Sequence, residues 1–244
     1  MIGSYSSALV TGASSGIGRA IAKALRQAGL EVFALGRNEK ALAALETECG
    51  AKPIVLDMRD KEGLATFFAE HPVDVVINNA GVLTTRAPFQ EIGADDIDAM
   101  IDINLKAPLH LARLAVPGMV ERKRGHMFFI GSSAGRYPHP NMSIYGTSKA
   151  GISMFCDALR CDLHSTGVRV SEIAPGRVKT ELYFDLMGAE QAQAELYDGY
   201  RLIAPEDIAT LIITALTLPE HVDVVRMEVF PTAQTVGGGR MAKD

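Results

Sequence analysis

The stretch ALVTGASSGIG, residues 8–18, decides the fold class because it joins an apolar strand, a tight turn and the start of a helix. Apolar residues at helical spacing follow the turn until Gly29 ends the pattern. Gly12, Gly16 and Gly18 permit the tight turn and let a phosphate approach the backbone. The unpaired N–H groups at the start of the helix would face that phosphate. This order predicts a dinucleotide-binding unit.

The rest of the chain continues the alternation of strands and helices. Further strands are predicted at residues 32–35, 54–56, 73–77, 127–130, 168–173 and 226–230, and further helices at 39–48, 61–70, 94–120, 143–163 and 205–216. Within the long helical stretch, Pro108 and Pro117 predict interruptions. The alternation predicts one α/β domain: a doubly wound (Rossmann), mostly parallel seven-stranded sheet with helices on both faces.

Two segments near the C-terminus depart from this alternation. Residues 180–204 are helical but polar and irregular, and they follow the carboxyl end of a strand, which predicts a substrate lid. Residues 232–244, with three consecutive glycines at 237–239, are predicted to form a flexible surface tail. No linker, repeat or low-complexity region interrupts residues 1–244, so we expect a single domain.

Composition excludes several classes of protein. The net charge of −5 without a basic block argues against nucleic acid or an anionic membrane as partner. No apolar run reaches the ~18 residues of a membrane span, and residues 1–7 do not have the pattern of a secretory signal. Cys49, Cys156 and Cys161 are expected to be free thiols in a reducing cytoplasm. The six histidines form no Cys/His cluster, so no metal is predicted.

Tyr145 and Lys149 lie four residues apart in a predicted helix and therefore share one face. A free phenol, with a pKa of about 10, is a poor base at neutral pH, and a nearby ammonium lowers that pKa. The pair could then exchange a proton with a carbonyl or hydroxyl group. Ser132 follows a strand on a loop where its hydroxyl could hold a substrate oxygen, and Ser133 is its alternative. Taken alone, the pattern also fits a packed tyrosine and a solvated lysine.

Asparagines mark two further positions. Asn79, Ala80 and Gly81 end the fourth predicted strand, where small residues would let a cofactor ribose approach; a simple turn is the alternative. Asn104 lies within the long helical stretch although asparagine is a poor helix former. Its simplest interpretation is a side chain that faces solvent.

Together these motifs resemble the short-chain dehydrogenase/reductase family, in its shorter soluble form, over essentially the whole chain. The motifs in register are Thr11-Gly12-x3-Gly16-x-Gly18, Asn78-Asn79-Ala80-Gly81, Asn104, Ser132, Tyr145-x3-Lys149 and Pro175-Gly176. The resemblance implies that Tyr145 is the catalytic acid/base and that Ser132 orients the substrate oxygen. It also implies that Lys149 lowers the pKa of Tyr145 and binds the nicotinamide ribose, and that Asn104 holds a water in a proton relay.

The resemblance further implies which residues contact the cofactor. Asp57 and Met58 would lie near the adenine, Asn79 near the adenosine ribose, and Val178 and Thr180 near the carboxamide. The full predicted cofactor-binding set is Gly12, Ser14, Ser15, Gly16, Ile17, Gly18, Arg37, Asp57, Met58, Asn79, Ala80, Gly81, Tyr145, Lys149, Pro175, Gly176, Val178 and Thr180.

The end of the second strand favours NADP(H) over NAD(H). An acid at this point accepts hydrogen bonds from the ribose hydroxyls and selects NAD, whereas an arginine accommodates the 2′-phosphate. Gly36 stands where the acid would be, and Arg37 follows it. The planar fork of an arginine matches phosphate, and Ser14 could add a hydroxyl. The alternative is that Arg37 faces water, because position 15 is Ser where many NADP-using relatives have a basic residue.

These observations predict an NADP(H)-dependent oxidoreductase that interconverts a carbonyl compound and its alcohol by hydride transfer, with Tyr145 as acid/base. A small or medium carbonyl compound, a sugar and a fatty acyl thioester all fit as substrate. A dinucleotide-binding sensor or scaffold without turnover is the alternative; the intact set of Asn104, Ser132, Tyr145 and Lys149 favours the enzyme. The substrate pocket is expected to be lined by Leu83, Ala134, Arg136, Tyr137, Leu182, Tyr183 and Leu186. Arg86 and Arg136 could meet an anionic group, although surface arginines are usually solvated.

Apolar residues on the helices near 100–120 and 145–164 exceed what one buried face needs. Ile152, Met154 and Phe155 beside Leu159 are examples. Surplus apolar surface of this kind marks interfaces, so we expect a homotetramer or a homodimer. The family resemblance points the same way.

Overall fold

The strands form one parallel sheet in the order β3-β2-β1-β4-β5-β6-β7 in a computed structural model, which describes residues 2, 5–237 and 240–243. The strands are β1 (Ser7–Thr11), β2 (Glu31–Gly36), β3 (Lys52–Val55), β4 (Val75–Asn78), β5 (Gly125–Ile130), β6 (Val168–Pro175) and β7 (Arg226–Val229). Every neighbouring pair is parallel. The order changes direction between β1 and β4, and ligands of such sheets bind outside the carboxyl ends of the strands at that point. The predicted seven-stranded sheet is confirmed.

The four central strands are buried along their whole length. β1, β4, β5 and β6 contain only buried residues, whereas the edge strands β3 and β7 are partly exposed. Their side chains alternate between two cores: Ala8 and Val10 belong to one cluster and Leu9 to the other. A parallel sheet needs cover on both faces, and this explains the continuous apolar runs in the sequence.

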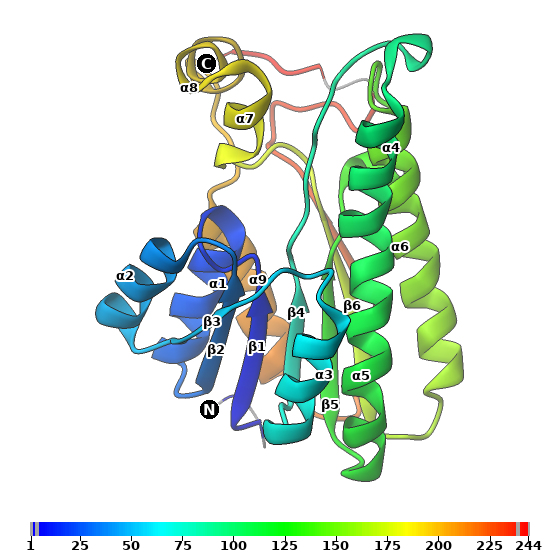
Figure 1. Cartoon of the computed structure of the whole chain (residues 1–244). Helices are drawn as coiled ribbons and strands as arrows, with labels where there is room; N and C mark the ends of the chain where they lie inside the picture. Colours follow the sequence, from blue (N-terminus) through cyan, green and yellow to red (C-terminus); the bar gives the residue numbers. More distant parts are fainter. Residues whose placement is uncertain (1, 3–4, 238–239, 244) are drawn as a thin grey trace.

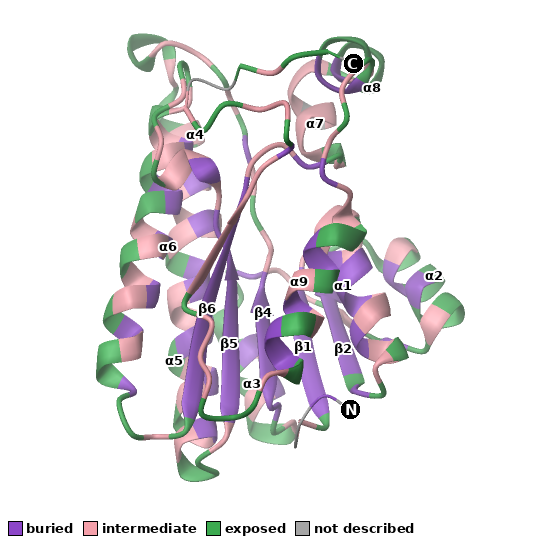
Figure 2. Ribbon diagram, turned by 180° about the vertical axis from the view of Figure 1, so that it is seen from behind, coloured by how far each residue is buried: buried purple, intermediate pink, exposed green. Residues whose placement is uncertain are grey.

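Helices supply that cover as two layers, seen from opposite sides in Figures 1 and 2. The helices are α1 (Gly16–Gln27), α2 (Glu39–Cys49), α3 (Lys61–Glu70), α4 (Ala94–Ile101), α5 (Ala107–Glu121), α6 (Ser143–Asp162), α7 (Phe184–Met187), α8 (Ala189–Ala192) and α9 (Pro205–Thr217). Side chains of α1, α2 and α9 join the core of Ala8, and those of α3, α5 and α6 join the core of Leu9. None of the helices in the described ranges is long and apolar enough to span a bilayer.

The predicted interruption at Pro117 is wrong. Pro117 lies inside α5, which continues to Glu121. Pro117 is exposed, so water can reach the carbonyl of Arg113 that loses its helical partner. The irregular segment lies earlier: Asp102–Lys106 is a π-helical turn between α4 and α5. The turn leads directly into α5, and Pro108 stands in the first turn of that helix, where a missing N–H is tolerated.

Residues 180–204, which we call the lid segment, leave the sheet after β6 and stand above its carboxyl edge (Figure 1). The segment contains a 3₁₀ turn (Glu181–Tyr183), α7, α8 and a π-helical turn (Gln193–Tyr197). The Tyr197 hydroxyl donates to the carbonyl of Thr180, and a bridge between Val178 and Ile203 closes the base of the excursion. The segment is therefore folded back on itself.

Gln234 attaches the C-terminal tail to the body of the protein. The Gln234 side chain accepts a hydrogen bond of 2.8 Å from the backbone N–H of Arg177, directly after β6. An antiparallel bridge joins Gln234 to Met241. Two of the three glycines of the predicted flexible tail, at positions 238 and 239, lie outside the described residues.

Candidate active site

The glycine-rich turn after β1 has the shape that a dinucleotide phosphate requires. Gly12 and Gly16 have φ of +65° and +49°, which disfavours any residue with a side chain. A Cβ atom on Gly18 would lie 2.2 Å from the carbonyl oxygen of Gly12, so the turn and α1 could not pack together. Ser15 precedes α1 without forming a side-chain cap, and the first N–H groups of this helix keep their capacity to bind an anion.

A cavity of about 650 Å³ lies along this turn. The predicted cofactor residues that line it are Gly12, Ser14, Ser15, Gly16, Ile17, Arg37, Asp57, Met58, Asn79, Ala80, Gly81 and Thr180. Tyr145, Lys149, Pro175, Gly176 and Val178 line a second, adjoining cavity. Gly18 lines neither cavity; its missing side chain lets the turn pack against α1. The protein therefore brings the predicted set together along one continuous edge of the sheet, and the turn, the helix end and the cavity fit a dinucleotide.

Asn79 holds the turn in place from the neighbouring strand end. Its amide donates to the carbonyls of Thr11 at 2.9 Å and Gly12 at 3.3 Å. The Thr11 hydroxyl accepts the N–H groups of Asn79 and Ala80 at 3.0 and 3.1 Å. These bonds tie the carboxyl ends of β1 and β4 together. Residues 79–81 therefore do more than form the simple turn that was the alternative interpretation.

Arg37 stands exposed at the end of β2, beside Asp57. Asp57 is paired elsewhere, because the guanidinium of Arg59 donates to it at 2.9 and 2.8 Å. These hydrogen bonds, with a smaller contribution from the charge of Arg37, lower the pKa of Asp57 to about 2. Arg37 itself forms no ion pair within the part of the chain that the structure describes. Its guanidinium is free to meet a phosphate at this end of the cavity.

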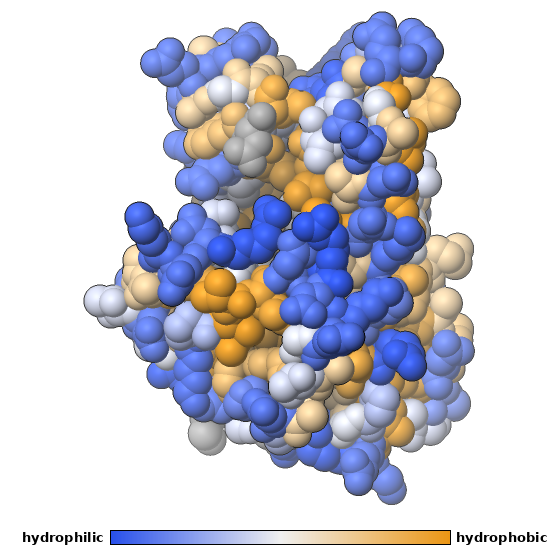
Figure 3. Space-filling view, viewed as in Figure 1, coloured by the Kyte–Doolittle hydropathy of each residue, from blue (hydrophilic) through white to orange (hydrophobic). Residues whose placement is uncertain are grey.

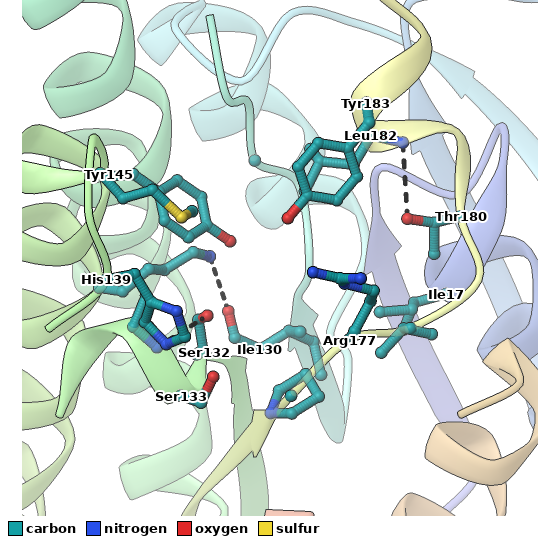
Figure 4. A pocket seen from close by; sticks show the side chains of 18 of the residues that line it. Ile17, Ile130, Ser132, Ser133, His139, Tyr145, Arg177, Thr180, Leu182 and Tyr183 are labelled. Atoms are coloured by element: carbon teal, nitrogen blue, oxygen red, sulfur yellow. Dashed lines mark hydrogen bonds between the residues drawn. The ribbon is translucent and has the colours of Figure 1, made fainter. Parts of the chain in front are cut away.

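Tyr145, Ser132 and Lys149 meet at the base of the second cavity (Figure 4). The Ser132 hydroxyl is the polar side chain whose interaction lowers the pKa of Tyr145. The Lys149 ammonium donates to the carbonyl of Ile130 at 2.9 Å and lies 5.8 Å from the centre of the Tyr145 ring. Ser132 rather than Ser133 therefore pairs with the tyrosine.

The expectation that Lys149 lowers the pKa of Tyr145 is wrong for the protein alone. Burial raises the pKa of Tyr145, the hydroxyl of Tyr183 adds to the rise, and only the interaction with Ser132 opposes it. Burial also lowers the pKa of Lys149 to about 8, with the Glu172 carboxylate acting against the change. Both side chains are buried, and desolvation disfavours both charged forms.

The interpretation of Asn104 as a solvent-facing side chain is also wrong. Asn104 is 1% exposed, in the π-helical turn. Its amide accepts from the backbone N–H of Val82 at 2.7 Å and donates to the Val82 carbonyl at 2.8 Å. The side chain thereby fixes the loop that follows β4, next to Gly81, and a weaker bond joins it to Ser148 at 3.3 Å.

The second cavity, of about 270 Å³, has a more polar lining than the sequence suggested. Of the predicted lining residues, Ala134, Leu182 and Tyr183 line it, and Leu83 lines the first cavity instead. Arg136 and Tyr137 point elsewhere, because both bind Glu228, at 2.9 and 3.2 Å. Figure 3 shows the surface hollowed below the lid segment, with hydrophobic residues in the hollow.

Among the residues of this cavity that sequence reasoning missed are His139, Arg177 and Gln234. Arg177 directly follows the Pro175-Gly176 motif, and a charged residue at a motif boundary was the one available signal. His139 lies on the loop between Ser132 and Tyr145, where its sequence context has no distinguishing feature. Gln234 belongs to the tail, which showed no pattern at all.

The fold and this site agree with what the chain is similar to. The family model described as "short chain dehydrogenase" matches residues 6–190, and the chain belongs to this family. A relative from Sinorhizobium fredii, the uncharacterized short-chain type dehydrogenase/reductase y4eK, is 52% identical over 98% of this chain and 96% of its own length.

Two further similarities concern proteins with a named activity. The NADP-dependent 3-hydroxy acid dehydrogenase YdfG of Escherichia coli K12 is 36% identical, over 94% of this chain and 96% of its own length. The solved closed form of a serine dehydrogenase complexed with NADP+ has a TM-score of 0.91 and 33% identity. That similarity covers 98% of this chain and 100% of the serine dehydrogenase.

Proposed function

We propose that this protein is an NADP(H)-dependent oxidoreductase that interconverts a small carbonyl compound and its alcohol. The observation that carries the proposal is the position of Tyr145, which lies with Ser132 and Lys149 where the dinucleotide cavity adjoins the second cavity. The similarity to an NADP-dependent 3-hydroxy acid dehydrogenase and to a serine dehydrogenase complexed with NADP+ supports both the cofactor and the reaction class. The free thiols of Cys49, Cys156 and Cys161 suit a reducing cytoplasm.

Cofactor binding is assigned to two ends of the first cavity. The backbone of the Gly12–Gly18 turn and the N-terminus of α1 would hold the pyrophosphate. Arg37, with the Ser14 hydroxyl near it, would hold the 2′-phosphate. Gly36 leaves room there, because a Cβ atom on it would already lie 3.4 Å from the Ser14 hydroxyl. An acid at this position would both crowd and repel the phosphate.

In the reductive direction the hydride for the carbonyl carbon would come from the nicotinamide, once NADPH is bound. The Tyr145 hydroxyl donates its proton to the carbonyl oxygen, and the product is the alcohol. The phenol is protonated at neutral pH, which is the form that reduction requires, and burial raises its pKa further. The Ser132 hydroxyl orients the same oxygen. Lys149, 5.8 Å from the centre of the Tyr145 ring, would hold the nicotinamide ribose.

The test is nicotinamide absorbance with NADPH and a panel of small aldehydes and ketones, for the wild type and Tyr145→Phe. General acid–base catalysis contributes about 10²–10⁴-fold, so Tyr145→Phe should lower kcat by at least about a hundredfold. The ring remains, so NADPH affinity should stay within about two-fold. Residual activity above a tenth of wild type would show that another group transfers the proton.

The second candidate, a dinucleotide-binding sensor or scaffold, gives a different result. Such a protein would bind NADPH and turn over no member of the panel in either direction. The convergence of Ser132, Tyr145 and Lys149 on one cavity favours the enzyme, because a binder has no use for it.

A further inference from the structure

The charges around the second cavity are all of one sign. Lys149, Arg86 and Arg177 line it together with His139. None of the described residues that line this cavity is an aspartate or a glutamate. The whole chain, by contrast, has a net charge of −5. Low-dielectric walls around charges of one sign concentrate ions of the opposite sign.

Arg177 is the half-buried member of this group. Its guanidinium lies 5.9 Å from the centre of the Tyr200 ring, and the Lys243 ammonium lies 5.2 Å from the same ring. Arg86 is exposed and stacks on Tyr183 at 5.8 Å. Within residues 5–237 and 240–243 neither arginine forms an ion pair with a described side chain.

Arginines outside the cavity behave differently. Arg136 is neutralised by Glu228 at 2.9 Å, and Arg59 by Asp57 at 2.8 Å. Arg136 and Arg59, which lie near the site, are thus paired with carboxylates. Arg86 and Arg177, which line the cavity, contact only aromatic rings among the described side chains. A guanidinium beside an aromatic ring keeps its donors available for a planar anion.

His139 lies close enough to both Arg86 and Arg177 to be affected by their charges, although the two arginines come from separate loops. Its Nε2 atom is buried and has no hydrogen-bond partner among the described residues. Burial lowers the pKa of His139, and the charges of Arg86 and Arg177 lower it further. Figure 4 shows His139 and Tyr145 entering the pocket from one side and Arg177 and Tyr183 from the other.

We propose that the substrate carries an anionic group, a carboxylate or a similar oxyanion, and that Arg177 binds it, with Arg86 assisting at the rim. The inference rests on the proposed function, because Tyr145 supplies the opposite contact, to the reacting oxygen. The substrate carboxylate would form two parallel hydrogen bonds with the Arg177 guanidinium and so take the place of the protein carboxylate that Arg177 lacks. The substrate class is then the small hydroxy acids and the corresponding oxo acids, and Arg177 determines specificity for them.

The test compares acids with their neutral esters. The probes are straight-chain hydroxy acids with the hydroxyl on carbon 2, 3 or 4, and their methyl esters, assayed with NADP+. Charge-assisted hydrogen bonds contribute enough for a factor of about ten to a hundred. The best acid should exceed its ester by at least about tenfold in kcat/KM. Arg177→Leu should lose about that factor with the acid, mainly in KM, and little with the ester.

Two further variants make the comparison specific. Arg113→Leu removes an exposed charge from α5, outside the cavity, and should leave activity with both substrates unchanged. Arg177→Lys keeps the charge but loses the planar fork, and should recover part of the activity with the acid. If Arg177→Leu lowers acid and ester by the same factor, or weakens NADPH binding, Arg177 has a structural or cofactor role and the proposal is overturned.

A binding experiment separates this inference from the proposed function. An alcohol and NADPH cannot react with each other, so the protein saturated with NADPH forms a dead-end complex with the hydroxy acid. Calorimetry should detect this complex in wild type and about tenfold weaker binding in Arg177→Leu. If the acid binds in a way that depends on Arg177, but no acid of the panel is oxidised with NADP+, the anion site is supported and the oxidoreductase is rejected. Equal affinity for acid and ester would overturn the anion site alone.

Discussion

At the scale of single residues, the buried ammonium of Lys149 gives the protein a measurable pH dependence. Burial lowers the pKa of Lys149 to about 8 in the folded protein, whereas a lysine in an unfolded chain has a pKa of about 10.4. Between these values the unfolded chain binds the proton and the folded protein does not. The free energy of unfolding therefore rises as pH rises through this window, and falls as pH drops towards 8.

We predict that this contribution disappears in Lys149→Met. From pH 7 to about pH 9.5 the wild type should gain about 2 kcal/mol of unfolding free energy relative to the variant, from the linkage of the two pKa values. Urea unfolding of both proteins without cofactor, at both pH values, measures the difference. Parallel pH profiles would mean that Lys149 has an ordinary pKa in the folded state.

Arg37 gives a second prediction at this scale. A charge-assisted contact is worth about 1.5–3 kcal/mol, so Arg37→Ala should lose about ten- to a hundredfold in kcat/KM with NADPH and little with NADH. Arg59→Ala is the matched control, because Arg59 lies nearby but is engaged by Asp57. Equal losses with the two cofactors, or a wild type that prefers NADH, would contradict the assignment of Arg37 to the 2′-phosphate.

At the scale of elements, the π-helical turn Asp102–Lys106 connects the helical layer to the site. The turn directs the Asn104 side chain inward. Its amide then forms hydrogen bonds with both the N–H and the carbonyl of Val82, as a neighbouring strand would. Gly81 must be small for the same reason, because a Cβ atom there would lie 3.2 Å from the Asn104 oxygen and 3.5 Å from the Lys149 ammonium.

We therefore predict that Asn104→Ala costs about 1–3 kcal/mol of unfolding free energy, since it leaves buried groups without partners. It should also lower kcat, because the loop beside Lys149 loses its support. Asn104→Asp retains the acceptor for the Val82 N–H and should lose less stability than Asn104→Ala near neutral pH. Chemical unfolding and steady-state kinetics measure the two effects. Unchanged stability in Asn104→Ala would show that water substitutes for the amide.

At the scale of the whole molecule, the surplus of apolar surface is smaller than the sequence suggested. Ile152 and Leu159 are buried in the protein's own core, and Phe155 packs partly against it. Met154, at 68% exposure on α6, remains available for a partner. Large exposed apolar residues on a long helix still favour association through this face.

We predict a homodimer or homotetramer that uses the Met154 face of α6. Sedimentation at micromolar concentration should show a species larger than the 26.1 kDa chain. Met154→Glu should shift it towards the monomer, because a charge in the interface would be desolvated. Val55→Glu, at another exposed apolar position, is the control and should not dissociate the assembly. A wild-type monomer would show that Met154 is simply a solvent-exposed residue.

Much of the fold followed from local pattern. The apolar runs and the glycine turn predicted the order of strands and helices and the parallel sheet, because both depend on spacing along the chain. The prediction at Pro117 was wrong because a proline inside a helix is disfavoured when it leaves the carbonyl four residues earlier without a hydrogen-bond partner. On the exposed face of α5, water can bind that carbonyl. The catalytic candidates were found because each lies at the carboxyl end of a strand or on the helix that follows.

By itself the sequence determined the strand-turn-helix unit and the order of the elements, since each depends on neighbours a few residues away. The catalytic set from Asn104 to Lys149 was implied by the resemblance to a family and stays a prediction. Only the tertiary structure decided that Asn104 faces inward and that burial, rather than Lys149, controls the pKa of Tyr145. It also decided between the arginines: Glu228 engages Arg136, and Arg177 faces the cavity. Desolvation and charge pairing depend on groups far apart in the chain, and no local spacing encodes them.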